Sequence, residues 1–123
     1  MIEMDIGKSH LNPFGGLHGG AYASAIDTAA YWALYCEMEE NVGWTSLDLR
    51  VDFLAPATGG KIEVKGRRIK LGKTICLAEA TAFDPEERVL AHGLSKMMVL
   101  KGAQTIREAV HFLGSAPLPP KFV

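Results

Sequence analysis

Residues 20–40, GAYASAIDTAAYWALYCEMEE, decide the fold. The stretch is rich in Ala, Leu and Met and is free of Pro, and Asn41 and Gly43 follow it, so it predicts a helix of roughly five turns that begins at the glycines and ends near residue 41. Its apolar residues lie almost all round the helix, which is typical of a buried helix. The rest of the chain must therefore cover it.

After residue 43 the apolar pattern changes to alternation. In TSLDLRVDFLAP, residues 45–56, one predicted face carries Leu47, Leu49, Val51 and Phe53, and the other carries Ser46, Asp48, Arg50 and Asp52. Turns at 56–60, 71–73 and 84–87 separate further predicted strands at 61–70, 74–83 and 88–100. Four strands joined by short turns predict an antiparallel meander. The predicted class is therefore α+β, a curved antiparallel β-sheet wrapped around one long central helix.

The composition limits the classes of protein to consider. The 123 residues suit one domain, 1–123, with a core at about 10–101 and a tail at 102–123. In that tail, TIREAVHFLG predicts a short helix, which the prolines of SAPLPPKFV cannot continue. Thirteen basic and fourteen acidic residues give a net charge of -1, which argues against nucleic acid as a partner.

The location of the protein is predicted from what the sequence lacks. It has neither an apolar run of membrane-spanning length nor a secretory leader, so we expect no membrane insertion. The two cysteines, Cys36 and Cys76, have no metal-type spacing and are expected to be buried free thiols. These features favour a cytoplasmic protein.

Gly19 and Gly20 stand where the predicted helix begins. A helix N-terminus presents N–H groups without intrahelical partners and a positive dipole end, and glycine lets a ligand approach the backbone. The pair is thus a candidate site for a carbonyl oxygen that gains negative charge. The alternative is that the glycines only allow a tight entry into a crowded helix.

Asp27 lies inside the same apolar segment. A carboxylate there must be paired, protonated or chemically useful. One reading is a structural pairing with Thr28, Tyr31 or a strand residue, and the other is a nucleophile or general base. Eight residues separate Gly19 from Asp27 by about 12 Å along one helix, so one chain cannot bring both to one reacting group. Two helices packed antiparallel about a two-fold axis can do so.

The motif HLNPFGGLHGGAYASAIDTA, residues 10–29, is similar to the signature of the hotdog-fold acyl-CoA thioesterases of the phenylacetate-pathway type, which are related to 4-hydroxybenzoyl-CoA thioesterase. In that family an Asn, a Gly, a His-Gly-Gly and a helical Asp or Glu recur at these spacings. SLDLRVDFLAPA at 46–57 and LGKTICLAEATAFD at 71–84 extend the resemblance over about residues 10 to 100. It implies hydrolysis of acyl-CoA thioesters without a cofactor or metal, in a homodimer or dimer of dimers whose sites cross the dimer interface.

The resemblance also implies roles for single residues. Asn12 would help to place the thioester or the attacking water, His18 would brace the loop, and Gly19 N–H would polarise the thioester carbonyl. Asp27 would attack that carbonyl or activate water, and the residues alone do not decide between the two. Ser46 would hydrogen-bond the water.

Other parts of the predicted site have alternatives. If the match to the family is shifted by one residue, Thr45 takes the role given to Ser46. Gly20 is expected to contact the substrate beside Gly19. The coenzyme A phosphates need a basic cluster, for which KGRRIKLGK at 65–73 offers Arg68, Lys70 and Lys73 as the chosen residues, unless these charges only solvate a strand face.

The same residues allow two other functions. An acyl-CoA binding or sensing module would keep the pocket but would not need Asp27, and a hotdog dehydratase would use a His with an acidic residue. His10, His92 and His111 share no metal-ligand spacing. A last open point is a set of aromatic residues that either line an acyl pocket or belong to the core: Tyr22, Tyr31, Trp32 and Trp44.

Overall fold

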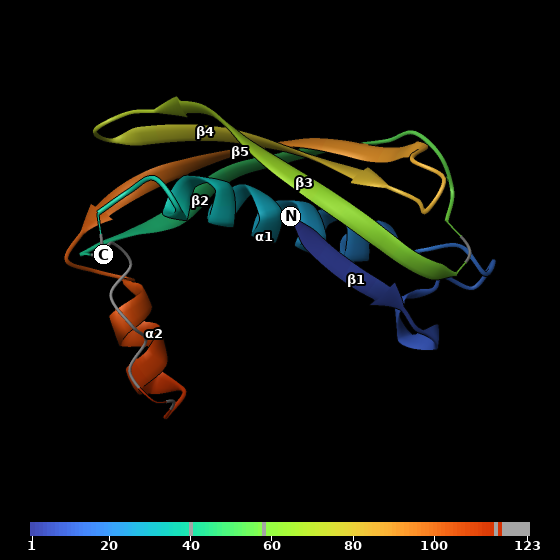
Figure 1. The fold of residues 1–123 in the computed structure, drawn as a ribbon, viewed down its shortest axis with the longest axis horizontal. Coiled ribbons are helices and arrows are strands. Elements are labelled where there is room, and N and C mark those ends of the chain that lie inside the picture. The colour runs from blue at the N-terminus through green and yellow to red at the C-terminus, as the bar shows by residue number, and fades with distance from the viewer. Residues whose placement is uncertain (40, 58, 115, 117–123) are drawn as a thin grey trace.

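The computed structural model describes residues 1–39, 41–57, 59–114 and 116. The chain forms one long helix, α1 (Gly19–Tyr35), a short helix, α2 (Ile106–Phe112), and a 3-10 turn at Lys8–His10. The strands are β1 (Ile2–Ile6), β2 (Val42–Phe53), β3 (Gly60–Leu71), β4 (Ile75–Phe83) and β5 (Val89–Lys101). They form one curved antiparallel sheet that arches over α1 (Figure 1). The predicted α+β architecture is confirmed.

The strand order is β1-β3-β4-β5-β2, so the predicted meander is right for β3, β4 and β5 and wrong for β2. β2 pairs with β5, and the edge of β3 is taken by β1, which the sequence analysis did not predict. The predicted turn at 56–60 is part of a longer connection. Leu54 and Ala55 donate to Leu90 O, and Leu17 donates to Ala57 O, so this segment is tied to its surroundings instead of folding back as a hairpin.

The inner face of the sheet packs on α1 through small residues. In β4, which was predicted as a strand, Cys76, Ala78, Ala80 and Ala82 are fully buried and alternate with outward-facing residues. A Cβ on Gly66 of β3 would lie only 2.3 Å from the backbone oxygen of Ala29. The absence of side chains at this crossing lets the helix lie close to the sheet.

The prediction that α1 is buried all round is wrong for the single chain. An exposed stripe with a spacing of four residues, the α1 stripe, consists of Gly20, Ser24, Thr28 and Trp32. A single sheet covers one side of a helix, so the opposite side stays open. The helix also ends earlier than predicted, at Tyr35, because the chain turns at Cys36 to reach β2, and Glu40 lies outside the described residues. The expectation of two buried thiols is right for Cys76 and wrong for Cys36, which is exposed just past the end of α1.

The predicted tail helix is confirmed as α2. Thr105 caps it, accepting from Glu108 N–H, while the Glu108 side chain accepts from Thr105 N–H. The prediction for residues 115–123 falls outside the described residues except at Ala116. Among the helices of the described ranges, none has the length and apolar character needed to cross a membrane.

Candidate active site

The N-terminus of α1 leaves one backbone donor open. His18 is the N-cap: its Nδ1 accepts from Gly20 N–H at 2.9 Å, and its carbonyl accepts from Ala21 N–H at 2.9 Å. Across residues 1–39, 41–57, 59–114 and 116, no group accepts a hydrogen bond from Gly19 N–H. Gly20 N–H is thus already paired, and Gly19 supplies the donor that remains for a ligand.

Asn12 and His18 build the loop that leads into α1. Asn12 Oδ1 accepts from Phe14 N–H at 2.9 Å and Gly16 N–H at 3.1 Å, and His18 N–H donates to His10 O at 2.8 Å. In the cap Nδ1 of His18 is the acceptor nitrogen, and the bracing role of His18 stays a prediction. The oxygen of Asn12 is used within the loop, so a contact from Asn12 to substrate would come from its amide nitrogen.

Asp27 is held through one of its two oxygens. Ser46 Oγ donates to Asp27 Oδ1 at 3.3 Å, and Ser95 Oγ donates to the same oxygen at 3.4 Å. In the described part of the chain, no Lys, Arg or His forms an ion pair with Asp27, and Oδ2 has no hydrogen-bond partner. The carboxylate is positioned by neutral hydroxyls, and one oxygen is left for chemistry.

A β-bulge brings Ser46 to Asp27. The register of β2 against β5 shifts between Ser46 and Asp48, so Leu47 is an extra residue and is 50% exposed. Ser46 then pairs opposite the buried Met97, on the face that packs against α1. The prediction that Leu47 lies on the covered face is therefore wrong, because a bulge re-aims the side chains that precede it. Ser46 is exposed in the single chain, as predicted, although its hydroxyl contacts Asp27 of α1. Thr45, one residue earlier, pairs opposite Met98.

Ser95 was not predicted as a site residue. It is fully buried on β5, where its register partners are Leu49 and Ala78. A polar residue in the inward-facing series of β5, between Gly93 and Met97, is the signal that could have found it. Naming its partner needs the register of the sheet over α1.

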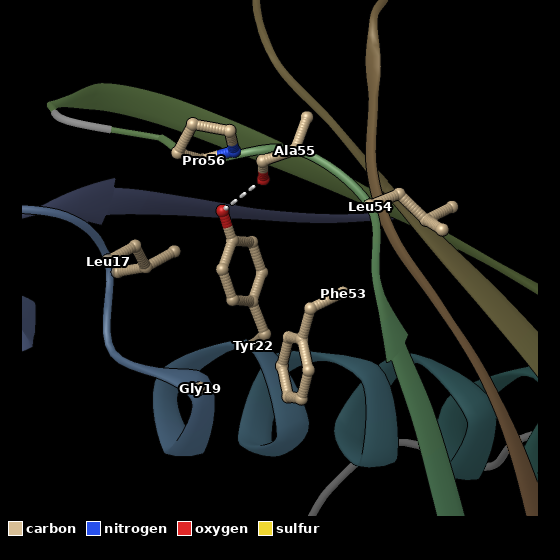
Figure 2. A pocket seen from close by; sticks show the side chains of 7 residues that line it. All are labelled: Leu17, Gly19, Tyr22, Phe53, Leu54, Ala55 and Pro56. Atoms are coloured by element: carbon tan, nitrogen blue, oxygen red, sulfur yellow. Dashed lines mark hydrogen bonds between the residues drawn. The ribbon is translucent and has the colours of Figure 1, made fainter.

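Gly19 also borders a pocket of about 440 Å³. Its walls are Leu17, Gly19 and Tyr22 on one side and residues 53–56 on the other (Figure 2). The rings of Tyr22 and Phe53 lie with their centroids 5.9 Å apart. Burial raises the pKa of Tyr22 above its ordinary value, so the phenol stays neutral, and its hydroxyl donates to Ala55 O.

The predicted phosphate-binding side chains do not gather on one face. Arg68 pairs opposite the helix-facing Ala78 and forms an ion pair with Glu37 at 2.7 Å. A register shift follows it, so that Lys70 pairs opposite Leu77, on the outer face, and Lys73 is exposed in the β3–β4 turn. Their role toward coenzyme A stays a prediction.

The remaining aromatic residues and histidines have mostly structural contacts. Ring contacts at 5.1–6.2 Å join Tyr31, Trp32, Tyr35 and Trp44. Of the predicted aromatic set, Tyr22 alone lines the pocket beside Gly19. His10 accepts from Gly7 N–H, and His92 pairs with Glu79. Among the described residues, no three His, Cys, Asp or Glu side chains are grouped to hold a metal ion.

Comparison with known proteins decides the family. Residues 14–91, more than half of the chain, match the family model described as Thioesterase superfamily. The chain belongs to the thioesterase superfamily. Acyl-coenzyme A thioesterase 13 of Mus musculus is 34% identical over 79 residues, which cover 63% of this chain and 56% of that protein. The medium/long-chain acyl-CoA thioesterase YigI of Escherichia coli is 28% identical over 98 residues, covering 68% and 62%.

Solved structures agree on the fold. Thioesterase HI1161 of Haemophilus influenzae superposes with a TM-score of 0.77 at 24% identity, covering 82% of this chain and 71% of that one. The BH2602 protein of Bacillus halodurans, solved with CoA, gives 0.77 at 21% identity, covering 80% and 69%. The predicted hotdog fold is confirmed. The chain spans 54 to 56% of the length of the acyl-coenzyme A thioesterase 13 proteins that it matches.

Proposed function

We propose that this superfamily member hydrolyses acyl-CoA thioesters to a free acid and coenzyme A. The observation that carries the proposal is the open Gly19 N–H at the positive end of α1, on the same helix as a carboxylate with one free oxygen. The thioesterase names of relatives and the CoA bound to the BH2602 protein support the same substrate class.

The proposed reaction uses each group in one step. Gly19 N–H hydrogen-bonds the thioester carbonyl oxygen as it becomes negative, and one such donor contributes about 3 kcal/mol in a transition state. Asp27 Oδ2 takes a proton from a water whose oxygen bonds to the carbonyl carbon. The C–S bond then breaks, and the sulfur leaves as thiolate and is protonated. Alternatively, Oδ2 attacks the carbonyl carbon directly, the C–S bond breaks, and coenzyme A leaves as thiolate and is protonated. Water then hydrolyses the resulting anhydride, and labelled water that attacks its Asp27 carbonyl would leave oxygen label in Asp27.

We infer that the complete site needs two chains. α1 is continuous from Gly19 past Asp27, so the two residues lie about 12 Å apart along its axis. The reacting carbonyl must lie within about 3 Å of the donor and close to the carboxylate. Within the part of the chain that the structure describes, no strand pairs with the outer edge of β2 and the α1 stripe is exposed, so both are open to a second copy of the chain. An isologous homodimer would form two such sites, and a dimer of dimers would preserve them.

The test is release of coenzyme A thiol from short, medium, long and aryl acyl-CoAs by the native protein and by two variants at one position. Gly19 is the first residue of α1, where proline fits, and His18 has the extended backbone (ψ 139°) that a following proline requires. Gly19→Pro removes the N–H, whereas Gly19→Ala keeps it. Both add a Cβ at 3.2 Å from Phe53, so the alanine variant controls for bulk.

We expect the native protein to turn over at least one of these thioesters, and Gly19→Pro to be slower than Gly19→Ala by about 10²–10³-fold in kcat. Equal rates for the two variants would contradict the role of the N–H. Native protein that binds acyl-CoA but never releases thiol would contradict the hydrolase and support a binding module.

A further inference from the structure

The pocket beside Gly19 has mainly apolar walls, in which the hydrogen-bond donors of Leu17, Tyr22, Leu54 and Ala55 are already paired. Tyr22 hydroxyl donates to Ala55 O at 3.3 Å, which is the dashed line in Figure 2. The N–H groups of Leu54 and Ala55 donate to Leu90 O at 2.9 and 3.1 Å, and that of Leu17 donates to Ala57 O at 2.7 Å. Gly19 N–H therefore stands at the rim of a surface that offers hydrocarbon contact and few hydrogen bonds.

The two arms of an acyl-CoA thioester differ in what they need from such a surface. The pantetheine arm carries amides and a hydroxyl, and each would lose its hydrogen bonds to water if it were buried here. A hydrocarbon acyl group loses nothing and gains from burial. With the thioester oxygen on Gly19 N–H, the acyl arm is the one that fits the pocket.

We propose that this pocket, given the thioesterase function proposed above, holds the acyl group and selects unsubstituted hydrocarbon acyl groups over hydroxylated ones. The volume of about 440 Å³ exceeds the roughly 150 Å³ of an apolar cavity that holds benzene, so a ring or a chain of several carbons fits. A hydroxyl on that group would exchange its hydrogen bonds to water for at most a bond donated to the Tyr22 phenol oxygen, because the Tyr22 O–H already donates to Ala55 O.

Phe53 sets the size of the pocket at the reacting end. Its ring lies against Gly19, since a Cβ added to Gly19 would be 3.2 Å from Phe53 Cζ, and against the ring of Tyr22. In the single chain Tyr22 is buried, whereas Phe53 is 57% exposed, so shortening Phe53 removes little packing within that chain. It is therefore the residue at which the pocket is best probed.

The experiment measures binding and turnover separately. Non-hydrolysable S-butyl-CoA, S-hexyl-CoA and S-(6-hydroxyhexyl)-CoA thioethers are titrated into the native protein by calorimetry, and thiol release is followed with the matching acyl-CoAs. The variants are Phe53→Ala, Phe53→Leu as a milder change, and Ile75→Ala as a control. Ile75 is another partly exposed apolar strand residue, on β4 and outside the pocket.

We expect each added methylene to tighten binding by about fourfold, so that the hexyl compound binds about sixteenfold better than the butyl compound. The hydroxyhexyl compound should bind about tenfold worse than the hexyl compound. Phe53→Ala should reduce the dependence on chain length by severalfold, Phe53→Leu should reduce it less, and Ile75→Ala should retain it.

Equal affinity for the plain and hydroxylated compounds, or a chain-length dependence that Phe53→Ala leaves intact, would overturn the acyl assignment while thiol release still upheld the thioesterase. Failure of every thioether to bind would overturn the assignment as well. If the native protein also released no thiol from any acyl-CoA, that separate result would contradict the proposed thioesterase function.

Discussion

Two carboxylates on opposite sides of the sheet, those of Glu79 and Asp27, differ in their hydrogen-bond partners. Glu79, on the outer face, uses both oxygens: Oε1 accepts from Arg67 and Oε2 pairs with His92 at 2.9 Å. Asp27, on the inner side, receives two serine hydroxyls on Oδ1. Cationic partners neutralise a carboxylate and fix it, whereas neutral donors on one oxygen orient it and leave its charge available. The partners, more than burial, separate a structural carboxylate from a candidate reactive one.

The largest expected effect comes from removing the charge of each carboxylate in turn. Asp27→Asn keeps the shape of the side chain but cannot act as base or nucleophile, so we expect kcat for thioester hydrolysis to fall by about 10²–10⁴-fold. Glu79→Gln should change kcat by about twofold or less. Steady-state thiol release on both variants measures the contrast, and similar losses in the two would remove the distinction drawn between them.

A smaller loss is expected when the hydroxyls on Asp27 are removed. Ser46→Ala and Ser95→Ala each delete a hydrogen bond to a charged group, which predicts a fall in kcat of about tenfold to a hundredfold. Thr45→Ala, the neighbouring position, is the control for Ser46 and should keep nearly full activity. The same assay compares the three, and a loss in Thr45→Ala equal to that in Ser46→Ala would contradict the bulged register.

The smallest effect concerns acid stability. The hydrogen bond from His92 and those from Arg67 lower the pKa of Glu79 from its ordinary value of 4.5. The stabilisation is therefore present above the unfolded-chain pKa and is lost as the pH falls through the lower folded pKa. Its size should be below about 1 kcal/mol because the pair is near the surface. Urea unfolding at pH 7 and pH 3 should show a smaller acid loss in Glu79→Gln, and an equal loss in both proteins would contradict the pairing.

Local sequence patterns predicted much of the fold. The turns and apolar runs correctly predicted β3, β4 and β5 as successive strands, and the glycines at the start of α1 located its N-terminus. The alternation of Ile2, Met4 and Ile6 was also present, but it was not recognised as the strand that covers the edge of β3. The place of β2 beside β5 was missed because strand order depends on long-range pairing, which short turns only suggest.

In the candidate site, too, local features could be predicted from the sequence and long-range contacts could not. The spacing of Gly19 and Asp27 is local, so their positions on one helix could be predicted. The contact from Ser46 depends on an extra residue in β2, and the contact from Ser95 depends on how β5 lies over α1. Neither follows from alternation. Bulges and sheet registers are set by packing against the whole sheet, so the hydroxyls on Asp27 emerge only with the structure.

The claim that Gly19 and Asp27 serve one reaction from two chains is tested most directly by mixing variants. Gly19→Pro and Asp27→Asn are each expected to be nearly inactive alone, and equal amounts are unfolded, refolded together and assayed for thiol release. Random pairing makes half of the dimers mixed, and each mixed dimer has one intact site, so activity should return to about one quarter of the native value. Mixed dimers that form, as shown by a tag on one variant, but stay inactive would contradict the account.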